Sequence, residues 1–144
     1  GRIKRLKKLL GGKRFFLTYG DGLSNVNLDT LLKFHVKKRA LVTITAVRPP
    51  ARFGAIKIKN DKILYFREKS TLDEGWINGG FFVMEPEIFK FIKNDKTILE
   101  KEPMQEIGKI KKLYAFKHKD FWQCMDTIRD KNILEREFKK IKKL

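Results

Sequence analysis

Short strand-forming runs alternate with segments of helical period along this chain of 144 residues. FFLTY at 15–19 is followed, after Asn27 as a candidate helix cap, by apolar residues that recur every three or four positions, and the β-branched run LVTITAV comes next at 41–47. The first kind of pattern favours a strand, and the second favours a helix. Strands interleaved with helices bury their apolar faces as layers. The sequence therefore predicts an α/β fold with a mixed sheet flanked by helices.

The rest of the chain continues this alternation. AIKIK at 55–59 and ILYFRE at 63–68 flank the turn pair Asn60-Asp61, which predicts a hairpin. Further strands are expected in WINGGFFVM, LYAFK and FWQCM, at 76–84, 113–117 and 121–125. Helices are expected at 2–10, from Pro86, near 97–108 and from Thr127, where Thr127 and Asp130 form a capping box and the helix packs on the sheet.

The composition fits one folded unit. Apolar residues make up 42% of the chain and charged residues 35%, and 144 residues is a common domain size, so we interpret residues 1–144 as one domain. The 34 Lys and Arg against 17 Asp and Glu give a formal net charge of +17. Such a charge favours phosphates, nucleotides, nucleic acid or anionic lipid as partners and does not choose among them.

The cysteine content and the hydropathy of the chain limit the cellular compartments that suit it. Cys124 is the one cysteine, so an internal disulfide is excluded and a reducing compartment is expected. No apolar run approaches the ~20 residues that cross a bilayer. We expect a cytoplasmic protein without a membrane partner. Because the chain begins at Gly1 with residues typical of an amphipathic helix, we also expect it to be part of a longer protein.

Two aspartates stand where a predicted strand ends. Asp21 lies between Gly20 and Gly22 after the first strand, and Asp126 lies between FWQCM and the closing helix. Open α/β sheets gather ligands at the carboxyl ends of their strands, and carboxylates suit Mg²⁺. The two acids could share one ion if their strands are neighbours, which the sequence alone does not show. A plain turn around Asp21 and a helix N-terminal charge at Asp126 are the structural alternatives.

A third set of residues borders the predicted hairpin. Glu and Asn in it are natural partners of sugar hydroxyls, and Lys69 would serve a phosphate as a point charge. The Gly79-Gly80 pair permits close approach of the backbone to a ligand. Taken alone, Lys69 also fits one solvated lysine among many. The members of the set are Gly54, Glu68, Lys69, Trp76, Asn78 and Gly79.

Other catalytic signatures are missing from the sequence. GGKR at 11–14 lacks the spacing of a phosphate-binding P-loop, no GxGxxG occurs, and no cluster of His, Cys and acids has zinc spacing. We interpret His35 and His118 as structural residues.

Five segments match, in order, the motifs of one enzyme family. They are FLTYGDGLSNVNL at 16–28, TAVRPPARFGAI at 45–56, FREK at 66–69, WINGGFFVMEP at 76–86 and FWQCMDTIRDKNILE at 121–135. With them the chain resembles the glucose-1-phosphate cytidylyltransferases, within the sugar nucleotidyltransferases that share a Rossmann-like catalytic domain. The resemblance covers nearly the whole chain. It implies the C-terminal portion of such a domain.

The resemblance also implies a reaction and residue roles. It implies an enzyme that transfers a nucleotidyl group from CTP to glucose 1-phosphate, giving CDP-glucose and pyrophosphate, with Mg²⁺ as cofactor. By this resemblance Asp21 and Asp126 are the magnesium carboxylates, and Lys69 contacts the sugar phosphate; these three are the expected catalytic residues. We expect a homo-oligomer in the full-length protein and a role in nucleotide-sugar and lipopolysaccharide O-antigen biosynthesis. The expected substrate-binding residues are Gly20, Gly54, Glu68, Trp76, Asn78 and Gly79.

Two departures from the family pattern qualify this expectation. Ser70 stands where the family commonly continues Glu-Lys with Pro. The glycine-rich N-terminal loop that cradles the triphosphate and reads the base is absent from these 144 residues. We therefore expect the N-terminal nucleotide-binding segment to be missing and the isolated chain to be inactive.

Two alternative functions stay open. One is another sugar-1-phosphate nucleotidyltransferase, with a different nucleotide or hexose, because the base-reading segment is missing. The other is a basic nucleic-acid-binding module, in which the net charge supplies phosphate contacts and aromatic residues such as Trp76 and Trp122 supply stacking. The basic residues are scattered along the whole chain and not gathered in one arm. We therefore expect no nucleic-acid partner.

Overall fold

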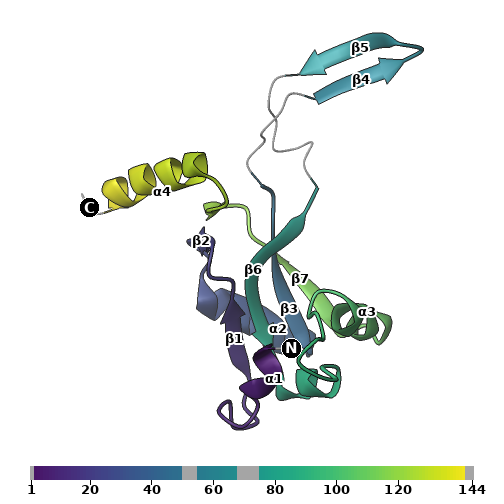
Figure 1. Cartoon of the computed structure of the whole chain (residues 1–144), viewed down its shortest axis with the longest axis vertical. Helices are drawn as coiled ribbons and strands as arrows, with labels where there is room; N and C mark the ends of the chain where they lie inside the picture. The colour runs from purple at the N-terminus through teal and green to yellow at the C-terminus, as the bar shows by residue number, and fades with distance from the viewer. Residues whose placement is uncertain (1, 50–54, 68–74, 142–144) are drawn as a thin grey trace.

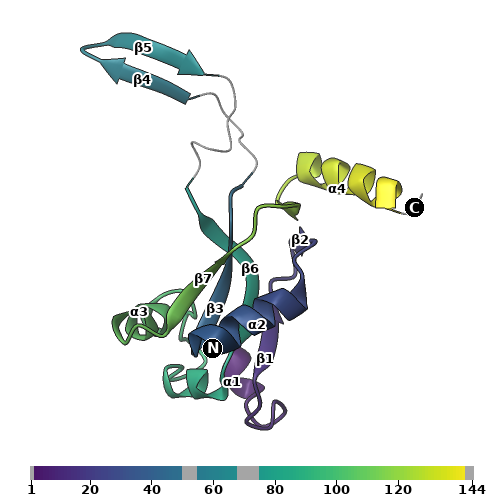
Figure 2. The ribbon, with the colours of Figure 1, turned by 180° about the vertical axis from the view of Figure 1, so that it is seen from behind.

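A computed structural model describes residues 2–49, 55–67 and 75–141 of the chain. Figures 1 and 2 show the arrangement from opposite sides. No helix in the described ranges is long and apolar enough to cross a bilayer. In chain order the elements are α1 (Arg2–Arg5), β1 (Phe15–Thr18), β2 (Gly22–Ser24), α2 (Leu28–Lys38), β3 (Val42–Val47), β4 (Ala55–Lys59), β5 (Lys62–Arg67), β6 (Ile77–Met84), η1 (Pro86–Lys90), α3 (Glu102–Lys109), β7 (Leu113–Lys117), β8 (Trp122–Cys124) and α4 (Ile128–Ile141).

A four-stranded mixed sheet organises the fold. Its strand order is β1-β6-β3-β7, and the β6 strand runs antiparallel to both β1 and β3 while β3 and β7 are parallel. The strands β1, β3 and β7 therefore point the same way, and their carboxyl ends lie at one edge of the sheet together with the start of β6 (Figure 1). Open α/β sheets bind ligands at this edge.

Helices cover both faces of this sheet, because successive strand residues point to opposite sides. On one face, Val42 of β3 belongs to a core with buried residues of η1 and α3, including Ile88 and Ile107. On the other face, Thr43 forms a hydrogen bond with His35 of α2, with 2.8 Å between Thr43 Oγ1 and His35 Nδ1. The predicted α/β fold with a mixed sheet flanked by helices is confirmed.

The local signals at two turns behave as the sequence predicts. Asn27 caps α2, since its side chain accepts a hydrogen bond from the backbone N–H of Thr30 at 2.8 Å. The hairpin β4–β5 turns at Asn60 and Asp61, whose φ angles of 46° and 63° are those of a tight two-residue hairpin turn. In Figures 1 and 2 this hairpin lies away from the four-stranded sheet.

Several helices differ in length or kind from the prediction. The first helix covers only Arg2–Arg5, the segment after Glu85 forms a 3₁₀ turn, and the helix predicted near 97–108 begins at Glu102. Pro103 suits the first turn of that last helix and marks its start. Helix α4 contacts β8 of the separate two-stranded sheet β2–β8, and Leu134 is buried on this helix. The expectation that α4 packs on the main sheet is therefore corrected.

Candidate functional site

The pairing of β2 with β8 brings Asp21 and Asp126 to neighbouring strands. Gly22 stands opposite Cys124, and the backbone N–H of Met125 donates to the carbonyl oxygen of Asp21 at 2.9 Å. Asp21 thus precedes one strand of the pair and Asp126 follows the other, at the same end. Both side chains are exposed. The strand predicted before Asp21 is β1, which pairs with β6 and not with β8, so the condition stated from the sequence is not met in that form. The two acids are brought together instead by β2, a strand after Asp21 that the sequence did not predict.

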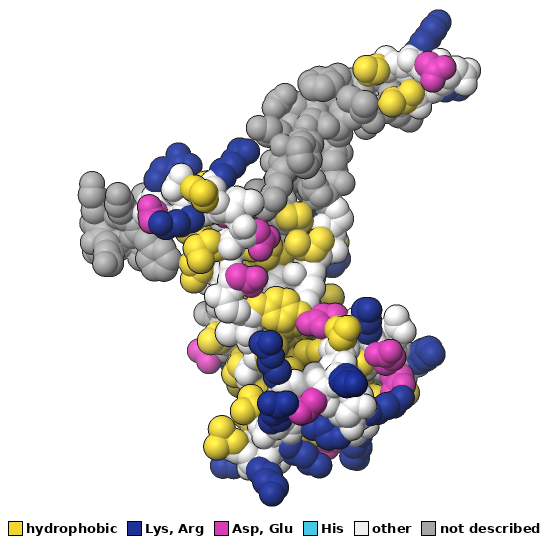
Figure 3. Space-filling model, viewed as in Figure 1, with side chains coloured by type: hydrophobic (Ala, Val, Ile, Leu, Met, Phe, Trp, Pro, Cys, Tyr) yellow, Lys and Arg dark blue, Asp and Glu magenta, His cyan; other side chains and the backbone are white. Residues whose placement is uncertain are grey.

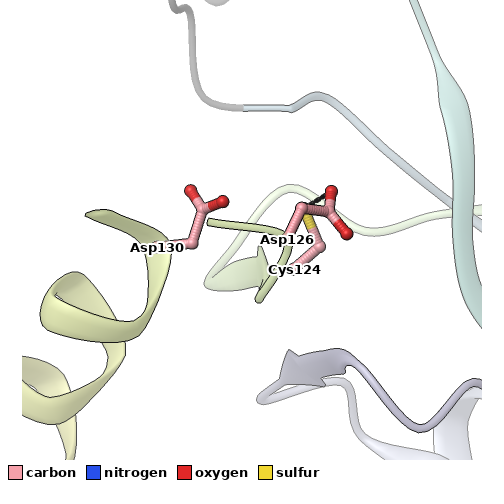
Figure 4. Close-up of side chains that lie close together, drawn as sticks. All are labelled: Cys124, Asp126 and Asp130. Carbon is pink, nitrogen blue, oxygen red and sulfur yellow. Dashed lines mark hydrogen bonds between the residues drawn. The ribbon is translucent and has the colours of Figure 1, made fainter. Parts of the chain in front are cut away.

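The environment of Asp126 fixes its orientation. Cys124 Sγ donates a hydrogen bond to Asp126 Oδ2 at 3.2 Å (Figure 4). Asp130 lies close by, and ligand atoms of Cys124, Asp126 and Asp130 fall within 4.8 Å of one another. Asp130 already accepts from Gln123 Nε2 and from the backbone N–H of Thr127, at 3.0 Å each. It therefore serves the start of α4, and Asp126 is the acid turned away from that network.

A cavity of about 660 Å³ lies beside Asp21 and is lined in part by Tyr19, Gly20 and Glu100. The Tyr19 hydroxyl donates to Glu100 Oε1 and accepts from Asn78 Nδ2 at 3.0 Å. Burial, followed by the contact with Glu100, raises the pKa of Tyr19 well above its ordinary value of 10.0. The phenol is therefore protonated at neutral pH and can donate a hydrogen bond.

Gly79 and Gly80 stand where a larger residue would clash with neighbouring side chains, which the sequence did not predict. A Cβ on Gly79 would lie 2.8 Å from Val47 Cγ1, and a Cβ on Gly80 would lie 2.8 Å from Tyr19 Cδ2. Gly80 also has φ +77°, and its N–H donates to Asn78 Oδ1 at 2.9 Å. The two glycines let β6 approach β3 and the Tyr19 ring within the chain itself. The approach of a ligand, for which the sequence suggested them, stays a prediction.

Trp76 and Asp21 line different cavities. Trp76 does not line the cavity beside Asp21; it lines another one, with Arg48 and Lys117 over its ring. Tyr19 and Glu100, by contrast, were missed by sequence reasoning. Tyr19 directly precedes the Gly-Asp-Gly turn, which is a usable signal. Glu100 has no sequence signal, because only folding brings its loop to Tyr19. Gly54, Glu68 and Lys69 lie outside the described residues.

Comparison with solved structures gives the fold class first. The chain resembles HddC from Yersinia pseudotuberculosis, with a TM-score of 0.66 and 19% sequence identity over 94% of this chain and 60% of that chain. The same protein complexed with GMP-PN gives a TM-score of 0.64 and 18% identity over the same shares of the two chains. The two chains share the same α/β fold.

Sequence comparison then gives the family. The nucleotidyl transferase family model matches residues 3–130, so this chain belongs to that family. It is also similar to the glucose-1-phosphate cytidylyltransferases of Salmonella typhimurium and Salmonella typhi, each 42% identical over 136 residues. These matches cover 94% of this chain and 53% of each relative, so the chain spans about half the length of these relatives. The resemblance drawn from the five sequence motifs is confirmed.

Proposed function

We propose that this chain supplies the sugar-phosphate and magnesium sites of a glucose-1-phosphate cytidylyltransferase. The whole enzyme would join CTP and glucose 1-phosphate. A phosphate oxygen of the sugar phosphate attacks the α-phosphorus of CTP, the bond to the β-phosphate breaks, and pyrophosphate leaves. The observation that carries the proposal is the position of Asp21 and Asp126 on the paired ends of β2 and β8, in a chain of this family.

The donor set around the two acids suits magnesium. Mg²⁺ prefers oxygen ligands and is held by one or two carboxylates together with substrate phosphates. Asp21 and Asp126 offer two exposed carboxylates, and the cavity beside Asp21 leaves room for a ligand next to that acid. In this proposal both acids hold the ion. When bound, the ion would neutralise part of the negative charge of the substrate phosphates.

The remaining work falls to side chains that position substrates. Tyr19 stays neutral and donates to Glu100 in the wall of the cavity beside Asp21, and Asn78 donates to the Tyr19 hydroxyl. We propose that Gly20 and Gly79 let substrate approach the backbone and that Asn78 contacts the sugar. Transfer of a nucleotidyl group needs mainly in-line positioning and charge neutralisation from a protein.

Part of the proposal rests on resemblance alone. It assigns the sugar phosphate to Lys69 and the sugar pocket to Gly54 and Glu68. Two expectations about the full-length protein also stay predictions, namely a cytoplasmic location and homo-oligomeric assembly.

The experiment measures magnesium-dependent CDP-glucose formation by the full-length enzyme and its Asp21→Asn, Asp126→Asn and double variants. Each single change removes one charge at nearly constant shape, so we expect each to lower turnover by about a hundredfold or more. Because both acids would act on one ion, the double change should cost much less than the product of the single losses. Asp29→Asn, an exposed acid on α2, is the matched control and should keep near-normal turnover.

Two outcomes would reject the shared ion. Near-normal activity in either single variant would show that the acid is not needed. Multiplicative losses in the double variant would show that the two acids act independently. Circular dichroism of each variant should match that of the unchanged enzyme, so that loss of folding is separated from loss of the site.

A second candidate keeps the family and changes the substrates. The resemblance implies that the base-reading segment lies outside these 144 residues, and a panel of nucleoside triphosphates and hexose 1-phosphates tests this candidate directly. A nucleic-acid module is not favoured. On the face in Figure 3, Lys and Arg side chains are spread over several elements and interspersed with Asp and Glu, where a nucleic-acid surface would gather them in one stripe.

A further inference from the structure

A second cavity, of about 870 Å³, lies at the same edge of the sheet as the Asp21 site but against a different strand. Its residues include Arg48, just after β3, Lys117, which ends β7, and Trp76, just before β6. Strand β7 is at one border of the four-stranded sheet and β1, which leads to Asp21, is at the other. Among the described residues, none lines both cavities.

Cations crowd one aromatic ring in this second cavity. Arg48 Cζ lies 5.0 Å from the centroid of the Trp76 ring, and Lys117 Nζ lies 5.5 Å from the same centroid. Lys119 also lines the cavity, and Asp120 is the one acid among the lining residues that the structure describes. Within the described residues none of the three cations forms an ion pair. Like charges held this close repel one another, and a bound anion would relieve that repulsion.

Arg48 provides a second, independent sign of a missing partner. Its Nε is shielded from solvent and has no hydrogen-bond partner among the described residues. A buried N–H without an acceptor costs free energy, and a guanidinium satisfies it best with the paired oxygens of a phosphate or carboxylate. The position of Arg48 on the cavity wall therefore makes an anion from solution a suitable acceptor.

The wall that carries Lys119 is held in place before any ligand arrives. His118 is buried, and its Nε2 lies 3.1 Å from both the Phe121 carbonyl oxygen and Ser24 Oγ. Ser24 Oγ in turn donates to the same carbonyl at 3.0 Å. These contacts fix the 118–121 segment against β2. A fixed wall lowers the entropy that binding would otherwise cost.

We propose that this second cavity binds a small phosphate monoester with a flat apolar body. Arg48 and Lys117 hold the phosphate, Lys119 adds charge, and the body of the ligand packs against the exposed part of Trp76 and against Phe121. Phosphate suits the combination of a forked guanidinium and point-charge ammonium groups. The inference does not depend on the proposed nucleotidyl transfer, since neither Asp21 nor Asp126 lines this cavity.

The chain carries two tryptophans, Trp76 and Trp122, and both line this cavity, so its intrinsic fluorescence reports on the site. The probe is phenyl phosphate, titrated into the full-length protein with calorimetry as a second readout. Inorganic phosphate and phenol are the comparison ligands. The first has the phosphate without the aromatic ring, and the second has the ring without the phosphate. We expect saturable binding of phenyl phosphate, at least about tenfold tighter than inorganic phosphate, and no saturable binding of phenol.

Variants decide whether the cavity is responsible. Arg48→Gln with Lys117→Gln should weaken phenyl phosphate binding by about tenfold or more. Lys37→Gln with Lys109→Gln removes the same charge from α2 and α3, away from the cavity, and should leave binding unchanged. Asp21→Asn should also leave it unchanged, which separates this site from the proposed active site. No saturable binding, equal losses in the two double variants, or a loss caused by Asp21→Asn would overturn the proposal.

Discussion

Gly80 shows how one residue without a side chain determines the surroundings of the site. Its φ of +77° lies in the region that favours glycine, and any Cβ there would meet the Tyr19 ring at 2.8 Å. The Tyr19 ring in turn contacts Phe82, with 5.4 Å between their centroids, and its hydroxyl reaches Asn78 and Glu100. Strain at Gly80 would therefore be transmitted to the wall of the cavity beside Asp21.

Gly80→Ala should destabilise the fold. The new methyl group requires both an unfavourable φ and a displaced aromatic ring, so we expect a loss of about 1–3 kcal/mol in the free energy of unfolding. Urea unfolding followed by circular dichroism measures it. Gly75→Ala is the control, because a Cβ at Gly75 meets nothing within 4 Å and needs no positive φ. Equal stability of the two variants would contradict the contact with Tyr19.

His35 is the second residue whose environment has a measurable consequence. Its side chain is fully buried between Thr43 and Glu85, at 2.8 Å and 3.2 Å. Burial lowers the pKa of His35 below its ordinary value of 6.5, although Glu85 opposes the shift and Arg14 adds to it. Glu85 is held by Arg14 in an ion pair at 2.5 Å. His35 is therefore neutral in the folded chain at neutral pH, as a structural residue.

The sign of the pH effect follows from that lowered pKa. Between the folded-state pKa and 6.5 the unfolded chain binds more protons than the folded one, so stability is full above that range and is lost as pH falls through it. We expect the melting temperature to fall between about pH 7.5 and pH 5.5, and this fall to be smaller in His35→Gln. Thermal unfolding of both proteins across this range tests it, and identical pH profiles would refute it.

At the scale of elements, the junction of β8 with α4 holds Asp126 in position. Thr127 and Asp130 exchange hydrogen bonds, with Asp130 N–H donating to Thr127 Oγ1 at 3.2 Å and Thr127 N–H donating to Asp130 Oδ2 at 3.0 Å. This is the reciprocal pattern of a capping box, as the sequence predicts. Gln123 of β8 also donates to Asp130 at 3.0 Å. These hydrogen bonds join β8, which precedes Asp126, to the start of α4, which follows it.

Asp130→Ala should loosen this junction. It removes the acceptor of the Thr127 N–H and one of the two acceptors of the buried Gln123 amide, so we expect a loss of about 1–3 kcal/mol in unfolding free energy. Hydrogen exchange of the first turn of α4 should accelerate as well. Glu135→Ala is the control on the same helix, since Glu135 makes only an exposed pair with Lys131 at 3.6 Å. A control that loses as much stability as Asp130→Ala would contradict the capping role.

At the scale of the whole molecule, the prediction concerns what the 144 residues can do alone. They contain no glycine-rich phosphate cradle, and positioning of the triphosphate contributes much of the rate in nucleotidyl transfer. We expect no pyrophosphate release from CTP and glucose 1-phosphate by the purified 144-residue chain with Mg²⁺. A coupled pyrophosphate assay measures it. Magnesium-dependent release above the background of the Asp21→Asn chain would contradict the prediction.

With the exception of the short strand β2 (Gly22–Ser24), the sequence by itself determined which segments become strands, the α/β class and the family. Those features depend on neighbours in the chain: the β-branched run of β3, the Asn27 cap, the Asn60-Asp61 turn and the Thr127–Asp130 box are local signals. Motif order likewise needs no folding to be read. The kind of helix after Glu85, which is a 3₁₀ turn, was not predicted. The start of α4 was predicted, but its packing against β8 was not, because packing depends on contacts between distant segments.

Only the tertiary structure decided which residues meet. Asp21 and Asp126 are far apart in sequence, and the pairing of β2 with β8 makes them neighbours. Glu100 reaches Tyr19, and Lys117 reaches Trp76, through the order of strands in the sheet. Strand order is set by the burial of apolar faces summed over the whole core, a non-local quantity. For that reason the sequence could name candidate acids, while the division of the sheet edge into two separate cavities required the fold.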